Sequence, residues 1–270
     1  MKKFWALYIC TWKYDVFRKE FYDSCEKYLL KDWEYEKHYF VWTDSDKIKW
    51  NDRIHVFHQG NLWWPDNTLK RFHIFLSQEK ELEKMDYLFF FNANLELKTP
   101  IWEEILPKEK DVIVVAKHPG FFNKNNLKFS YDRNPKSTAF IKKWEWNYYV
   151  QWALNWWTSY SYLKMCKILS RNVDIDNDNW IIALWHDESH LNRYVYDLEM
   201  DAHREKFMVL PPSYLYPEDR DFSFPCKILI RDKSKYIDVD KIKWNKKLIK
   251  DKIRTIYRII IHKINWLKRK

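Results

Sequence analysis

Three consecutive ionisable side chains, His186, Asp187 and Glu188, make the Trp185–Asn192 segment the first place to look for chemistry. They fall at a break in a helical pattern that spans about 179–196. A carboxylate at such a break can act on an electron-poor carbon, either as a nucleophile or by stabilising developing positive charge. The same residues also fit an exposed helix start that Asp187 caps, so both interpretations stay open here.

A second polar cluster follows the apolar run Tyr87–Phe91, which is typical of a buried central strand. Asn92 and Asn94 come directly after it, with Ala93 between them. Ligands of open α/β sheets bind beyond the carboxyl ends of the strands, so this point is a candidate binding site. The two amides carry no charge and would bind a hard cation weakly, so we expect no metal and no other cofactor.

The elements that must position these groups alternate between strands and helices, which predicts an α/β fold. Apolar runs predict the strands, and apolar residues at spacings of three and four predict the helices. The stretch 119–160 is irregular and polar, and we predict no strand in it. The predicted strands are 3–10, 38–42, 53–58, 87–91, 111–116 and 227–230, and the predicted helices are 15–30, 67–84, 159–170 and 179–196.

Length and composition indicate a globular intracellular protein. The chain has 270 residues, 46% of them hydrophobic, which is enough for one large domain with a substantial core. No apolar run reaches the roughly 18 uncharged residues of a transmembrane helix. The apolar start is predicted to be a strand rather than a leader, because no small-residue cleavage site follows it. The four Cys residues show no paired spacing, so we expect reduced thiols, no zinc site and a cytoplasmic location.

The net charge of +10 is concentrated at the C-terminus. Residues 241–270 hold twelve Lys or Arg and one acid, whereas residues 1–240 are close to neutral. Apolar residues in this tail repeat at spacings of three and four, which predicts a basic amphipathic helix over 236–270 behind a domain over 1–235. Such a helix suits peripheral contact with an anionic membrane, or else it docks on the domain with its basic face in solvent.

The chain holds 17 Trp and 2 Gly, whereas average usage predicts roughly 19 Gly. Several Trp lie in polar, turn-like surroundings where Gly is common, such as Trp63-Trp64-Pro65 and Trp144-Glu145-Trp146. We therefore hypothesise that many of these Trp stand at UGA codons that the source organism reads as Gly. The alternative is a genuinely Trp-rich protein that stacks sugars on its indoles.

Seven segments spread over residues 5–235 resemble glycosyltransferase family 6, which includes the blood-group A and B transferases. The Asn92-Ala93-Asn94 sequence resembles the bacterial, metal-independent branch in particular, since other members have Asp-x-Asp there. The segments that carry the resemblance are Tyr8–Tyr14, Trp64–Phe72, Asp86–Asn94, His118–Phe121, Tyr148–Trp157, Trp185–Asn192 and Ser213–Pro217.

The resemblance implies a GT-A fold, with a central, mostly parallel twisted sheet flanked by helices. It implies transfer of galactose or N-acetylgalactosamine from a UDP donor, with retention, to the 3-position of a β-galactoside. The implied catalytic residues are His186, Asp187 and Glu188. The implied donor-binding residues are Ile9, Cys10, Thr11, Tyr14, Arg71, Asn92, Ala93, Asn94, Gln151, Ala153, Arg231 and Lys233. The implied acceptor-binding residues are His118, Ser130, Trp185 and Glu188.

Two positions refine this expectation. Without a metal, the departing UDP still needs positive charge, and Arg71, Arg231 and Lys233 are the candidates. Ala153 stands where some members have Gly and narrows the space beside the sugar's 2-position, which favours galactose over the N-acetylated sugar.

The resemblance also supports the recoding hypothesis, because family members keep Trp at Trp64 and Trp185. Family members have Gly at the positions of Trp12, Trp63, Trp102, Trp144, Trp146, Trp152, Trp156, Trp157 and Trp180.

The expected partners are the UDP-sugar, an oligosaccharide or glycolipid acceptor and an anionic membrane surface at the inner face. Two alternatives stay open. The first is a catalytically inactive, sugar-binding relative. The second is a nucleic-acid-associated protein that uses the basic tail, although the body shows no basic patch or nucleic-acid motif, so we expect no nucleic acid.

Overall fold

The computed structural model describes residues 2–31, 34–48, 50–62, 64–106, 112–200 and 206–238. It divides the chain into two units, Met1–Arg231 and Asp232–Lys270. The second unit is described only for residues 232–238, which include the short 3-10 helix η6 (Lys233–Lys235). The predicted basic helix lies almost entirely outside the described residues.

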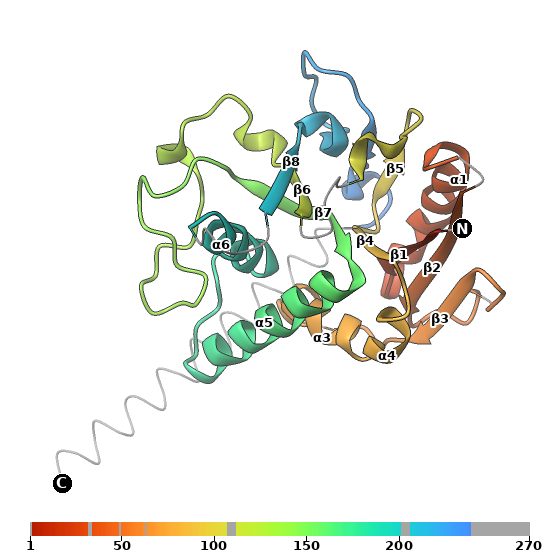
Figure 1. The fold of residues 1–270 in the computed structure, drawn as a ribbon, viewed down its shortest axis with the longest axis horizontal. Helices are drawn as coiled ribbons and strands as arrows, with labels where there is room; N and C mark the ends of the chain where they lie inside the picture. The colour runs from red at the N-terminus through yellow and green to blue at the C-terminus, as the bar shows by residue number, and fades with distance from the viewer. Residues whose placement is uncertain are drawn as a thin grey trace, which may run out of the picture. The chain divides into compact units, whose positions relative to one another are not determined.

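The first unit is built around a seven-stranded sheet with strand order β3-β2-β1-β4-β7-β6-β8 (Figure 1). Neighbouring strands are parallel, except that β7 runs antiparallel to both β4 and β6. The strands are β1 (Lys2–Ile9), β2 (Tyr35–Thr43), β3 (Ile54–His58), β4 (Tyr87–Phe91), β6 (Val112–Lys117), β7 (Val150–Thr158) and β8 (Lys206–Leu210). A smaller sheet has the order β5-β10-β9, formed by Leu95–Leu97, Ile228–Ile230 and Tyr216–Pro217. The predicted α/β fold is therefore confirmed.

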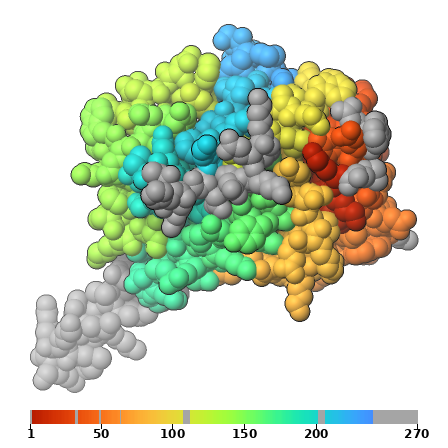
Figure 2. Space-filling view, viewed as in Figure 1, coloured from red at the N-terminus to blue at the C-terminus, as the bar shows by residue number. Residues whose placement is uncertain are grey.

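Helices cover both faces of the large sheet, because its central strands are apolar on both sides. The helices are α1 (Arg18–Tyr28), α2 (Asp66–Leu69), α3 (Arg71–Leu76), α4 (Glu79–Leu82), α5 (Ser159–Asp178) and α6 (Asp187–Met200). One core packs α3, α5 and α6 against the sheet, and the other packs α1 and the small sheet against the opposite face. Figure 2 shows α5 (green) beside α4 (orange) on the surface, and the two helices are in contact.

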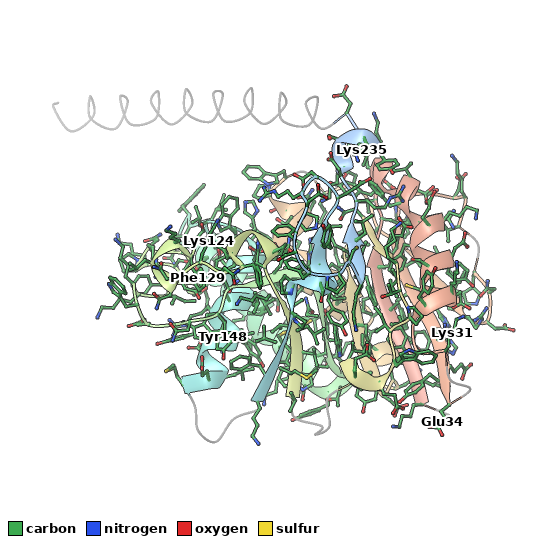
Figure 3. All side chains as sticks on the ribbon, turned by 90° about the horizontal axis from the view of Figure 1, so that it is seen from above. Lys31, Glu34, Lys124, Phe129, Tyr148 and Lys235 are labelled. Atoms are coloured by element: carbon green, nitrogen blue, oxygen red, sulfur yellow. The ribbon has the colours of Figure 1, made fainter. Side chains whose placement is uncertain are left out.

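The side chains fill the space on both sides of the strands (Figure 3). The loop with Lys124 and Phe129 lies at one end of the sheet, and Lys31 and Glu34, next to β2, lie at the other. Among the described residues, no helix is both long and apolar enough to span a bilayer.

Two predictions about elements were wrong. The stretch expected to be irregular contains β7, whose apolar pattern is interrupted by the polar residues Gln151 and Asn155. The predicted helix over 179–196 begins only at Asp187, since the residues before it form turns. β8 was also missed, and it completes the sheet edge beside β6.

We expect acid to weaken the contact between α5 and α6. His190 in α6 is almost fully buried, with Asp176 of α5 at 3.9 Å, and burial lowers the pKa of His190 to about 4. The unfolded chain binds this proton first, near the usual pKa of about 6.5, so the stability is complete above that value and is lost as pH falls. Between pH 7 and pH 5 the free energy of unfolding should fall by about 1–2 kcal/mol through this group.

Urea unfolding at several pH values measures this loss. The variant His190→Asn should flatten the pH dependence, whereas His58→Asn, at an exposed position, should leave it unchanged. An equally steep loss in His190→Asn would contradict the prediction.

Candidate active site

The carboxyl ends of β1 and β4 bring two of the predicted segments to one edge of the sheet. The strands are adjacent, with Tyr8 opposite Phe91, so the segment after β1 emerges beside Asn92–Asn94. The hydroxyl of Tyr8 donates a hydrogen bond to the Ala93 carbonyl oxygen at 2.9 Å. This bond ties the two loops together at the edge where open α/β sheets bind ligands.

The loop after β1 contains the predicted donor residues Ile9, Cys10, Thr11 and Tyr14. Cys10 is fully buried, and its carbonyl oxygen accepts a hydrogen bond from the Thr43 hydroxyl at 2.9 Å. Burial raises the pKa of the Cys10 thiol to about 12, so the thiol is neutral and serves packing. The loop is held further by Asp44, whose carboxylate accepts from the backbone N–H of Trp12 at 2.7 Å.

The loop after β4 is locked by amide hydrogen bonds. The Asn92 side-chain NH₂ donates to Asn94 Oδ1 at 3.0 Å, and the Asn94 side-chain NH₂ donates to the Arg231 carbonyl oxygen at 2.7 Å. The Arg231 N–H donates back to the Asn94 carbonyl oxygen at 2.9 Å. Asn94, which is 2% exposed, therefore fastens the loop to the end of β10.

Strand β7 supplies the predicted donor-specificity residues. Its pairing with β6 is interrupted, because Val115 lies opposite Asn155 whereas Ala116 lies opposite Gln151. The intervening residues leave β6 and turn to the β4 side, where the Asn92 N–H donates to the Ala153 carbonyl oxygen at 2.9 Å. The bulge thus brings Ala153 to the loop after β4.

A buried ion pair joins the starts of two helices on the other face of the sheet. Arg71, at the start of α3, lies 3.0 Å from Asp187, at the start of α6, measured from Nε to Oδ2. Both side chains are about nine-tenths buried, and the guanidinium also lies over the rings of Phe90 and Trp152. Asp187 is therefore a buried partner of Arg71 rather than an exposed residue at the helix start.

Glu188 is a carboxylate with a strongly raised pKa. It lies next to Asp187, and its Oε2 accepts from the backbone N–H of Trp152 at 3.3 Å. Burial, followed by the charge of Asp187, raises the pKa of Glu188 to about 8. The Tyr149 hydroxyl, the Trp152 N–H and Arg71 oppose this shift, because each favours the carboxylate form. A carboxyl group with such a pKa is a functional-site candidate.

The predicted acceptor residues gather around Tyr149. His118 follows β6, and its ring lies 5.6 Å from the Tyr149 ring, while the Tyr149 hydroxyl lies 3.4 Å from the Ser130 carbonyl oxygen. Burial lowers the pKa of His118 to about 4, and its Nδ1 accepts from the Gly120 N–H at 2.9 Å. His118 is therefore neutral at physiological pH and keeps one N–H to donate.

Trp185 and His186 form an accessible rim before α6. Half of the Trp185 surface is exposed. The backbone N–H of Trp185 donates to the Ser189 hydroxyl at 2.9 Å. The His186 ring meets the Trp64 ring edge-on at 4.9 Å. An exposed indole beside Glu188 is the kind of surface on which a sugar ring stacks.

Two of the predicted cations are placed differently from Arg71. Arg231 is buried and lies 3.5 Å from Glu20 and 3.7 Å from Glu96, so two carboxylates already compensate its charge. Lys233 belongs to the second unit. Its role toward a donor stays a prediction.

Sequence reasoning missed two residues of the site, Tyr149 and Asn192. The signal for Tyr149 was its position directly before β7, which was not recognised as a strand. Asn192 lay inside the quoted Trp185–Asn192 segment, one helical turn after Glu188, which was a usable signal.

The Asn94 amide should not be replaceable by a carboxylate. Asn94→Asp removes the NH₂ that donates to the Arg231 carbonyl oxygen and places a negative charge against that oxygen. We expect a loss of about 1–3 kcal/mol in the free energy of unfolding, because a buried acceptor loses its partner. Asn92→Asp, at the less buried amide, is the matched control and should cost less in chemical unfolding. Equal losses in the two variants would contradict the proposed role of the Asn94 side chain in holding the loop to Arg231.

Comparison with known proteins places the chain in a family. The model of glycosyltransferase family 6 matches residues 7–243. The O-antigen biosynthesis glycosyltransferase WbnI of Escherichia coli is 33% identical over 230 residues, which cover 84% of this chain and 94% of the relative. The globoside alpha-1,3-N-acetylgalactosaminyltransferase 1 of Gallus gallus is 28% identical over 233 residues (81% and 63%). The histo-blood group ABO system transferase 2 of Rattus norvegicus is 26% identical over 238 residues (85% and 66%). The chain spans about two thirds of these two vertebrate proteins, and it belongs to glycosyltransferase family 6.

Proposed function

We propose that the protein transfers galactose from UDP-galactose, with retention and without a metal, to the 3-position of a β-galactoside in a surface glycan. The observation that carries the proposal is Glu188, beside the Arg71–Asp187 pair at the ligand-binding edge. The family membership supplies the reaction class. The names of two relatives, an alpha-1,3-N-acetylgalactosaminyltransferase and an O-antigen biosynthesis glycosyltransferase, support the linkage and the setting.

In the proposed reaction, the bond from the sugar C1 to the diphosphate oxygen breaks, and its electron pair leaves with UDP. The acceptor O3 forms the new bond to C1, and its proton passes to the departing diphosphate. Glu188, as a carboxylate, stabilises the positive charge at C1 or bonds to it transiently. Each role requires the carboxylate form.

Donor and acceptor lie on opposite sides of Glu188 in this proposal. The loops with Cys10 and Asn92 hold the nucleotide and diphosphate, while His118 and Trp185 hold the acceptor. Ala153 is buried under the donor loop, and its methyl group favours galactose over the N-acetylated sugar. The basic segment 241–270 attaches the enzyme to an anionic membrane, where a glycolipid acceptor is presented.

Replacing Glu188 should abolish most turnover. We expect Glu188→Gln to lower kcat by about 10²–10⁴-fold, because a neutral amide cannot stabilise charge at C1 as a carboxylate does. In the wild type, kcat/KM should rise as pH increases through about 8, the pKa of Glu188. Transfer to lactose from UDP-galactose measures both quantities. Near-normal turnover of Glu188→Gln would remove Glu188 from the mechanism.

Transfer should not depend on a divalent metal. The support is the amide pair Asn92 and Asn94, which offers no negative charge to a cation. Activity should be the same in EDTA and in added manganese. A loss in EDTA that manganese restores would show that a metal completes the site.

The tail should serve membrane association and leave the chemistry unchanged. A chain truncated after Lys235 should lose binding to anionic vesicles, since twelve Lys or Arg are removed, and should keep its activity on lactose. Co-sedimentation with vesicles measures binding. Equal sedimentation of both forms would indicate that the tail contacts protein instead.

A further inference from the structure

Three tryptophans occupy backbone conformations that suit glycine. Trp12, Trp144 and Trp180 have φ of 57°, 71° and 58°, whereas neither glycine of the chain has a positive φ. This left-handed region crowds the Cβ atom of every residue except glycine, at a cost of roughly 1–2 kcal/mol. It is uncommon for any large side chain.

Trp180 lies at the end of α5 in a helix-terminating motif that requires a left-handed residue. The Ile181 N–H donates to the Asp176 carbonyl oxygen at 2.8 Å, and the Trp180 N–H donates to the Asn177 carbonyl oxygen at 2.9 Å. These two bonds define a Schellman motif, in which the position of Trp180 is usually glycine. Its indole is 96% exposed, so packing does not compensate for the strained backbone.

Trp144 is the third residue of a turn in which the Glu145 N–H donates to the Lys142 carbonyl oxygen. A positive φ at this place favours glycine or asparagine. The chain contains an acceptable version of the same turn, where Asn123 has a φ of 59° and the Lys124 N–H donates to the Phe121 carbonyl oxygen. Trp144 is 66% exposed and so gains little from burial.

Trp12 lies in the loop after β1, beside the proposed nucleotide site. It is 38% exposed, and its backbone N–H donates to Asp44 in this left-handed conformation. A glycine here would leave bare backbone facing the donor.

We propose that positions 12, 144 and 180 are glycine in the native protein, at UGA codons that the source organism reads as glycine. The support is independent of any relative and comes from φ taken together with the hydrogen bonds of each turn or helix end, since Leu30 and His186 also have a positive φ. Trp102, Trp146, Trp152, Trp156 and Trp157 do not have a positive φ, so for them recoding stays a prediction, and Trp63 lies outside the described residues.

Substitution tests the backbone argument. Trp144→Gly and Trp180→Gly should each increase the folding equilibrium constant by about three- to tenfold. This gain is the backbone strain that glycine relieves, reduced by the larger conformational entropy that glycine gives the unfolded chain. Trp50 is the matched control, because it is 59% exposed, has no positive φ and packs edge-on against His55, so Trp50→Gly should decrease the constant. Equal effects at positions 50, 144 and 180 would overturn the proposal.

Mass spectrometry of the protein from its source cell tests the decoding directly. Glycine at positions 12, 144 and 180 is the expected result, and tryptophan there would overturn the proposal. Neither measurement needs enzymatic activity, so failure of the proposed function would not affect it.

A second inference rests on the proposed function and concerns Asn192. This side chain is 1% exposed and bridges α6 to β7. Its Oδ1 accepts from the Val150 N–H at 3.0 Å, and its NH₂ donates at 2.8 Å both to the Val150 carbonyl oxygen and to the Glu188 carbonyl oxygen. Asn192 therefore pairs with Val150 as a neighbouring strand would, while it holds the first turn of α6.

Two residues close to Val150 in the chain supply donors that reach the Glu188 carboxylate. These donors are the Tyr149 hydroxyl and the backbone N–H of Trp152. The charged groups that face Glu188 are Asp187, which disfavours the carboxylate, and Arg71, which favours it. We propose that Asn192 is a positioning residue that sets the register in which β7 delivers both donors to Glu188.

Loss of this register should change the titration of Glu188. Asn192→Leu should move the midpoint of the kcat/KM profile upward by about one pH unit, because the loss of one hydrogen bond to a charged group is worth about that much. Tyr149→Phe removes one donor without altering α6 and should shift the midpoint in the same direction. Val195→Ala, at a buried core position of the same helix, should lower stability and leave the midpoint unchanged.

Carbon NMR of the Glu188 carboxyl gives the same midpoint without turnover, so an inactive protein would contradict the proposed function and still test Asn192. A shift in Tyr149→Phe with none in Asn192→Leu would overturn the positioning role. So would equal shifts in Asn192→Leu and Val195→Ala.

Discussion

The site depends on one antiparallel strand inserted into an otherwise parallel sheet. β7 lies between β4 and β6 and runs against both, so its first residues arrive at the edge where the neighbouring strands end. A parallel strand would bring its last residues there. This reversal lets a single segment, Tyr149–Ala153, contact Glu188, the loop after β4 and His118, and the bulge opposite β6 lets it turn toward β4.

Charge at the candidate site is balanced between neighbouring side chains. Arg71 is neutralised by Asp187, and Arg231 by Glu20 and Glu96. The loop after β4 uses amides where an Asp-x-Asp sequence would bring two negative charges, and one of these amides holds the end of β10. Glu188 is left with a raised pKa, so its protonation state is sensitive to nearby charge. In the proposed reaction, the positive charge that develops at C1 as the bond to the diphosphate breaks would favour the carboxylate.

Much of the fold was predictable because strands such as Tyr87–Phe91 are apolar on both faces and are followed at once by polar residues. Candidate site residues were predicted from local patterns and from family resemblance, and the structure brings Arg71 of α3 close to Asp187 and Glu188 of α6. β7 was not predicted, since Gln151 and Asn155 interrupt its apolar pattern. Asn192 was missed for a different reason, because its role depends on a strand that is distant in sequence and close only after folding.

The end of α5 has a consequence beyond this enzyme. Hydrogen bonds from Trp180 and Ile181 close the helix in a geometry that selects for the absence of a side chain, and the geometry persists although the chain supplies the largest one. Under the proposal made above, a helix terminus of this kind indicates glycine where the sequence shows tryptophan. Backbone torsion angles combined with terminal hydrogen bonds would then identify recoded positions in a translated sequence.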